Sequence, residues 1–128
     1  MAAGPFLVRA GMDPAVVQSL TGVSDLDTVR VRPAPGWLRR LWIGPVHATT
    51  LMATIYVAPE VLAGDGPALG RLLVHELVHV RQWRTAGPLR FLVRYLGDYL
   101  RGRLAGRNHA EAYRMIRYEV EARRVAGG

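Results

Sequence analysis

The chain is organised around the stretch Leu72–Trp83, which reads LLVHELVHVRQW. In a helix, His75 and His79 lie one turn apart on the same face, so both imidazoles can reach a single point. Zinc accepts two such imidazole ligands in tetrahedral coordination. Glu76 lies about 100° round the helix from His75, where its carboxylate reaches a water held on a metal rather than the metal itself. The spacing predicts His75 and His79 as zinc ligands and Glu76 as a general base.

The residues around this motif predict a buried helix from about Ala68 to Arg84. Apolar side chains occupy most of its circumference: Leu69, Leu72, Leu73, Val74, Leu77, Val78 and Val80. Two histidines and a glutamate inside such a helix need polar partners, and a metal supplies them. The alternative is a pair of core histidines hydrogen-bonded to the backbone. The complete His-Glu-x-x-His spacing favours zinc over this alternative.

Length and composition predict one folded domain over residues 1–128. A chain of 128 residues is long enough for one hydrophobic core but not for a second one, and half of its residues are hydrophobic. The chain has no cysteine, so a metal must be bound by histidine and carboxylate. The lack of disulfides fits a reducing compartment, and we see neither a signal peptide nor a transmembrane segment. We therefore expect a cytoplasmic protein.

Positive charge is the strongest bias in the composition. The formal charge is +7, and all 17 basic residues are arginines. Such an excess allows weak attraction to nucleic acid or anionic lipid but says nothing about the fold. We do not expect nucleic acid to be the partner.

The remaining sequence predicts a mixture of helices and strands. Asp13-Pro14 begins a short helix that ends near Leu20. Thr28–Arg32 and Thr49–Val57 are rich in β-branched residues and predict two strands. Two further helices are expected over Pro88–Leu104 and His109–Ala126. In the first of these, Asp98 is expected to form a solvated ion pair with Arg94 and Arg101.

The last helix offers a third metal ligand. Glu119 and Glu121 are about 200° apart round the helix, so they cannot face the same metal. Glu119 lies in an apolar stripe formed by Ala112, Met115, Ile116 and Ala122, whereas Glu121 lies among arginines and is expected to pair with Arg117. A buried carboxylate is costly unless it is paired or bound to a cation. We therefore predict Glu119 as the third ligand. A buried salt bridge is the alternative, and His109 is a rival ligand at the start of the same helix.

These two segments carry a resemblance to a known family. Leu73–Val80 resembles the active-site helix of zincin metallopeptidases. It does not fit the metzincins, because Gln82 and Thr85 stand where that group has Gly and His. Tyr118–Ala126 resembles the Glu-x-x-Ala-Asp helix of gluzincins, including the prenyl-protein proteases, with Glu119 at the zinc-ligand position. Arg123 departs from that pattern, because those enzymes have an Asp there that orients a ligand histidine.

In size the chain is similar to the minigluzincins, compact single-domain zinc peptidases. The resemblance implies an α+β fold in which a small mixed sheet lies beside an active-site helix and a C-terminal ligand helix. It also implies Zn2+-dependent hydrolysis of a peptide or protein substrate, with an extended substrate paired to the edge of Thr49–Val57. Candidates for polarising the substrate carbonyl are Tyr95, Tyr99, Tyr113, His47 and His109.

Two other functions fit the sequence. One is a catalytically weak, zinc-stabilised binding or regulatory domain with a protein partner, which the Arg123 departure favours. The other is a basic module associated with nucleic acid or a membrane, in which the histidine motif is coincidental.

Overall fold

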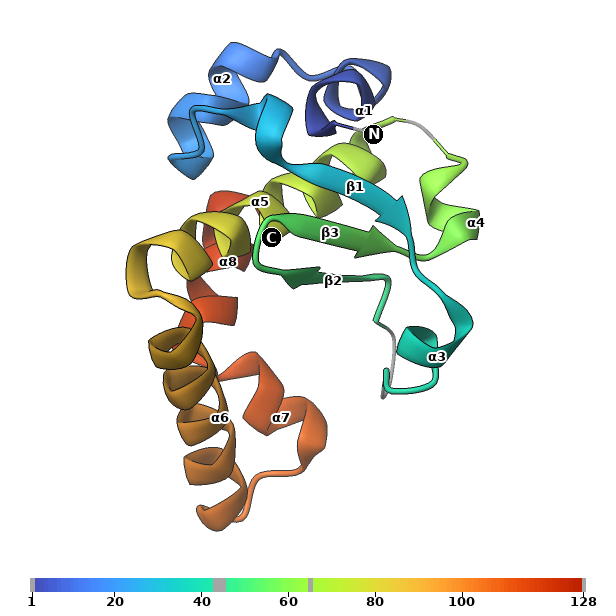
Figure 1. Ribbon diagram of the computed structural model, residues 1–128. Coiled ribbons are helices and arrows are strands. Elements are labelled where there is room, and N and C mark those ends of the chain that lie inside the picture. The colour runs from blue at the N-terminus through green and yellow to red at the C-terminus, as the bar shows by residue number, and fades with distance from the viewer. Residues whose placement is uncertain (1, 43–45, 65, 128) are drawn as a thin grey trace.

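The long histidine helix lies at the centre of the fold. A computed structural model describes residues 2–42, 46–64 and 66–127 (Figure 1). Helix α5 runs over Pro67–Ala86, with Pro67 at its first turn and Gly87 at its C-terminal cap. Gly87 has φ 85°, a positive value that glycine adopts without strain, and the helix ends there. The predicted helix is confirmed, with ends that differ by one or two residues.

A three-stranded sheet packs against α5. Its order is β1-β3-β2, with β1 (Arg30–Pro33) parallel to β3 (Thr54–Val57) and β2 (Ala48–Leu51) antiparallel to β3. The predicted single strand over Thr49–Val57 is wrong, because the chain reverses at Met52 to make a hairpin. Met52 has φ 57°, which residues other than glycine rarely adopt. No Gly, Asn or Asp signals this turn.

Short elements surround this centre. They are α1 (Ala3–Arg9), α2 (Pro14–Thr21), the 3-10 turn η1 (Leu26–Thr28), α3 (Gly36–Arg39) and α4 (Pro59–Leu62). Helix α2 begins as predicted, because the Asp13 side chain accepts a hydrogen bond from the backbone of Ala15. The core lies between α1, α2, the sheet and one side of α5. Its fully buried members include Leu7, Val17, Val29, Ile55, Val57, Leu73 and Leu77.

The C-terminal third adds three helices. Helix α6 (Pro88–Leu104) ends where predicted and extends away from the sheet, with α7 (His109–Arg114) beside it (Figure 1). The expected helix over His109–Ala126 is interrupted, because Ile116 is extended and α8 begins anew at Arg117. Ile116 is fully buried, whereas Met115 is about half exposed. The predicted burial of Met115 was therefore wrong.

Aromatic stacking and an ion pair are among the contacts that hold α6 against the rest of the chain. Phe91 stacks on Trp83 of α5 and on Tyr118 of α8, with ring centroids 4.2 and 4.7 Å apart. Asp98 accepts hydrogen bonds from the backbone nitrogen and the guanidinium of Arg117 at 2.9 to 3.2 Å.

The ion pairs expected in this region need correction. The Asp98 side chain is only 8% exposed and its main partner is Arg117, with Arg101 more distant at 3.7 Å. Glu121 pairs with Arg81 instead of Arg117. The Asp98–Arg117 pair forms because the chain turns back after α6. Residues 19 positions apart in sequence therefore meet between α6 and α8.

The observed fold class agrees with expectation. The chain is a small α+β protein with a mixed sheet, an HExxH helix and a C-terminal helix that carries Glu119. Among the described residues, no helix is long and apolar enough to cross a membrane.

Candidate metal centre

Three side chains from two helices converge at one point. His75 and His79 come from α5, and Glu119 comes from the first turn of α8. The Nε2 atom of His75 lies 3.0 Å from Glu119 Oε1, and the Nε2 atom of His79 lies 3.1 Å from Glu119 Oε2. One potential ligand atom from each residue lies within 4.8 Å of the others. The predicted triad is therefore assembled.

The geometry of this triad fits a small divalent cation. Tetrahedral zinc with bonds of about 2.0–2.1 Å places adjacent ligand atoms roughly 3.3 Å apart. The two histidine-to-carboxylate distances, 3.0 Å to Oε1 and 3.1 Å to Oε2, are close to that value, and the ligand atoms of all three residues lie within 4.8 Å of one another. The imidazole ring centroids are 5.0 Å apart and the ring planes are inclined at 76°. Both rings present Nε2 to the carboxylate. Two imidazoles and one carboxylate form a donor set that zinc commonly uses.

Electrostatic coupling is strong within the triad. Burial lowers the pKa of His79, but hydrogen bonding and charge attraction from Glu119 outweigh it and raise the pKa to about 9. Burial alone would raise the pKa of Glu119, yet hydrogen bonds from His75 and His79 hold it well below its usual value. Without a cation, a proton on His79 thus compensates the buried carboxylate.

Glu76 is held beside the triad by the edge strand. The Oγ1 atom of Thr50 in β2 donates a hydrogen bond of 2.6 Å to Glu76 Oε2. Glu76 itself is only 5% exposed. Thr50 therefore fixes the carboxylate that the sequence nominates as general base. Sequence reasoning missed Thr50, because the hairpin that orients it was not predicted.

Gln82 is the second residue that sequence reasoning missed. Its side-chain oxygen accepts a 2.7 Å hydrogen bond from Nδ1 of His79. Ligand histidines commonly use their second nitrogen in this way, which fixes the ring. Gln82 lies one turn after His79, so the helical spacing carries this signal. In the related pattern an Asp at the position of Arg123 orients a histidine. In this chain the side-chain amide of Gln82 on α5 is the hydrogen-bond partner of His79.

Two phenols surround Glu119. Tyr95 of α6 donates a 2.7 Å hydrogen bond to Glu119 Oε2, so its hydroxyl orients the ligand carboxylate. Burial raises the pKa of Tyr113, and the charges of Glu119 and Glu76 raise it further. Tyr113 is therefore protonated and lies close to both carboxylates. Of the candidates named for polarising a carbonyl, Tyr95 and Tyr113 are the two whose surroundings include Glu119.

Other candidates lie elsewhere. His109 accepts or donates a 2.9 Å hydrogen bond with Tyr99, and neither residue joins the triad. Glu121 accepts a 2.7 Å hydrogen bond from the side-chain nitrogen of Gln82 on the other side of α8. The prediction that Glu119 and Glu121 face different directions is confirmed.

Comparison with known proteins gives a family for the segment that holds the two histidines. The eCIS core domain model matches residues 8–87, more than half of the chain. The chain belongs to the eCIS core domain family. This eCIS core family is related to the minigluzincin-like metallopeptidases. The match ends before Glu119, so the third position of the triad comes from the C-terminal part of this eCIS core protein. No curated protein and no solved structure matches the chain.

Proposed function

We propose that this eCIS core protein is a zinc-dependent peptidase of the gluzincin type. The observation that carries the proposal is the convergence of His75, His79 and Glu119, with the Glu76 carboxylate fixed beside them. When bound, zinc would lower the pKa of a water molecule and polarise the substrate carbonyl. The three side chains would hold the ion and leave its fourth position open.

The protein's own groups supply the proton transfers. Glu76 accepts a proton from the attacking water and returns it to the leaving amine, so that the C–N bond breaks and the water oxygen joins the carbonyl carbon. Thr50 keeps the carboxylate in place. Tyr113 donates a hydrogen bond to the charge that develops on the carbonyl oxygen.

An extended substrate would pair with β2, the edge strand nearest to Glu76. This assignment refines the earlier expectation, because β3 is the central strand and β2 is the edge strand whose Thr50 contacts Glu76. The carbonyl of Thr50 already accepts a 3.2 Å hydrogen bond from Trp83 Nε1. Pairing with a peptide therefore uses the part of β2 near Ala48.

One observation favours a second candidate, a zinc-stabilised binding domain with little hydrolysis. Two open cavities of the described residues, of about 400 and 190 Å³, lie along α8 on the side of Tyr118 and Glu121. Neither is lined by the triad or by Glu76. A domain that only binds zinc needs no cavity over the metal.

Substitution of Glu76 separates these functions. The Glu76→Gln variant should keep stoichiometric zinc and lose hydrolysis of a denatured protein substrate by about 10²–10⁴-fold. Glu121→Gln is the matched control and should change neither property. His79→Ala should lose zinc and stability together. A wild-type protein that binds zinc but cleaves nothing would establish the binding domain instead, and a wild-type protein without zinc would contradict both candidates.

A further inference from the structure

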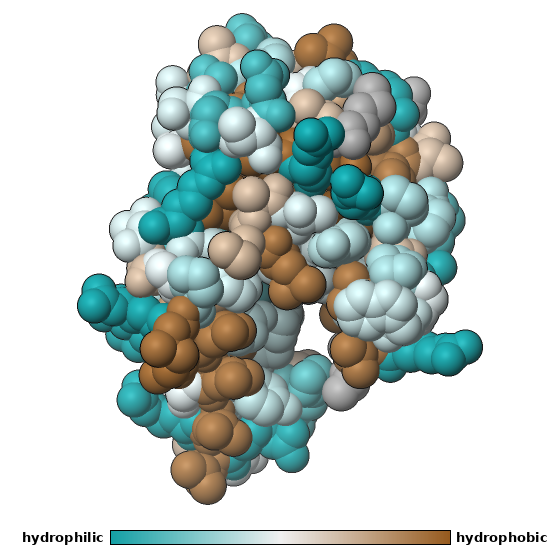
Figure 2. Space-filling view, viewed as in Figure 1, coloured by the Kyte–Doolittle hydropathy of each residue, from teal (hydrophilic) through white to brown (hydrophobic). Residues whose placement is uncertain are grey.

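Helix α6 carries an apolar stripe that the fold leaves uncovered. With about 100° per residue, its members lie within an arc of about 120° along the full length of the helix. They are Leu89, Leu92, Val93, Leu96, Leu100 and Leu104, and all are exposed, from 44% to 89%. Figure 2 shows hydrophobic residues gathered along the part of the surface that α6 forms. We call this set the leucine stripe.

The leucine stripe is separate from the core and from the metal centre. The inward face of α6 carries Phe91, Tyr95 and Gly102, which pack against α5, α7 and α8. Because the inward face already supplies these contacts, the stripe is not needed to hold α6 in place. Contiguous apolar surface of this kind marks an interaction site.

Arginines border the stripe. Arg90, Arg94 and Arg101 lie at about 100–140° from Leu89 round the helix, immediately beyond one edge of the stripe. Among the described residues, Arg90 and Arg94 have no carboxylate partner, and the only acid of α6, Asp98, is taken by Arg117. The surface therefore combines apolar side chains with uncompensated positive charge.

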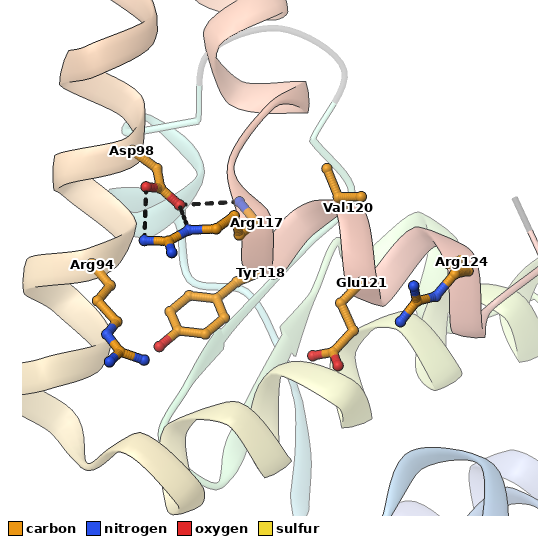
Figure 3. A pocket seen from close by; sticks show the side chains of 7 residues that line it. All are labelled: Arg94, Asp98, Arg117, Tyr118, Val120, Glu121 and Arg124. Atoms are coloured by element: carbon orange, nitrogen blue, oxygen red, sulfur yellow. Dashed lines mark hydrogen bonds and ion pairs between the residues drawn. The ribbon is translucent and has the colours of Figure 1, made fainter.

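The arginine edge opens onto a groove between α6 and α8. The groove has a volume of about 400 Å³, and Arg94, Arg117 and Arg124 reach it from both helices (Figure 3). Two carboxylates also line it, Asp98, which is paired with Arg117, and Glu121, which is paired with Arg81. The Tyr118 hydroxyl is buried at this groove without a hydrogen-bond partner among the described residues. Among the described residues, Arg94 and Arg124 have no carboxylate partner within ion-pair distance, so a phosphate group there would meet their guanidinium groups.

We propose that α6 binds the surface of an anionic lipid membrane, with the leucine stripe in the interfacial region and the arginine edge on lipid phosphates. A helix with a leucine face and an arginine-rich flank is the form that lies in the membrane interface. A second copy of the chain is a poorer occupant, because it brings the same arginines and a formal charge of +7. An acidic bilayer complements both parts of this surface.

Vesicle sedimentation with the full chain tests the proposal. The protein should sediment with vesicles of phosphatidylcholine and phosphatidylglycerol, bind phosphatidylcholine alone much less, and be released by high salt. Arg90→Gln/Arg94→Gln should weaken binding to the anionic vesicles by roughly 25-fold, about fivefold for each charge removed. Leu96→Asn/Leu100→Asn should weaken it at least about tenfold.

A matched control removes similar apolar surface elsewhere. Val16 and Leu20 are 53% and 51% exposed on α2 at the same four-residue spacing, against 55% and 58% for Leu96 and Leu100. Val16→Asn/Leu20→Asn should bind vesicles like the wild type. All variants change exposed side chains, and circular dichroism checks that they fold.

Three results would overturn the proposal. These are no sedimentation with anionic vesicles, an equal loss in the α2 control, and a dimer in solution that Leu96→Asn/Leu100→Asn dissociates while vesicle binding is absent. The last result would assign the leucine stripe to a second copy.

Discussion

His79 donates a hydrogen bond from Nδ1 to the side-chain oxygen of Gln82, 2.7 Å away. The amide cannot be turned round, because its nitrogen donates to the Tyr118 carbonyl at 3.0 Å and to Glu121 Oε1 at 2.7 Å. Nδ1 of His79 therefore carries a proton and Nε2 faces Glu119. Gln82 thus holds the His79 ring in one orientation, whereas the related helix pattern uses an Asp at the position of Arg123 to orient a histidine. Gln82 also joins α5 to α8.

Replacing Gln82 should therefore weaken the metal site. We expect Gln82→Leu to lower zinc affinity by about 10–100-fold, because the His79 ring loses the partner that fixes its orientation. Competition with a chromophoric chelator measures this change. Glu121→Gln is the control, since an amide there still accepts the hydrogen bond from Gln82. An unchanged affinity in Gln82→Leu would show that packing alone orients His79.

The sequence was sufficient to predict that the two histidines and Glu119 lie close together, because helical spacing and the cost of a buried carboxylate are local properties. It was not sufficient for Thr50, which faces Glu76 only because of a hairpin turn at Met52 that no turn residue announces. The sequence likewise does not announce the break in the helix at Ile116. No Gly or Pro lies between His109 and Ala126, and packing decides where the helix stops.

Thr50 should affect catalysis without affecting the metal. Thr50→Val removes the 2.6 Å hydrogen bond to Glu76 while keeping the shape of the side chain. If the chain is a peptidase, we expect kcat to fall by about 10–100-fold with zinc content unchanged, because the carboxylate is no longer held for proton transfer. Thr49→Val, at the neighbouring position of β2, is the control. Loss of zinc in Thr50→Val would instead assign Thr50 to the folding of the site.

The metal-free protein should lose stability at alkaline pH. The folded pKa of His79 is about 9, above the usual value of 6.5, so its pairing with Glu119 stabilises the fold fully below about pH 6.5 and no longer above about pH 9. The pKa of Glu119 is lowered, so its contribution is present above about 4.5 and is lost as the pH falls further.

Urea unfolding in the presence of a chelator tests this window. We expect the free energy of unfolding to be highest near pH 5–6 and to fall by on the order of 2 kcal/mol toward pH 9. His79→Ala should remove most of the alkaline decrease. A free energy of unfolding that rises between pH 6 and 9 would contradict the ion pair.

Zinc binding should release a proton at neutral pH. Because the pKa of His79 is about 9 without metal, its Nε2 carries a proton that zinc must displace. We expect about one proton to be released per zinc at pH 7 and almost none at pH 10, with zinc affinity rising about tenfold per pH unit between them until the pKa is passed. Calorimetric titration in buffers of different ionisation enthalpy counts the protons. The absence of this proton release at pH 7 would mean that His79 is already neutral, and that the Glu119 carboxylate is compensated by another group.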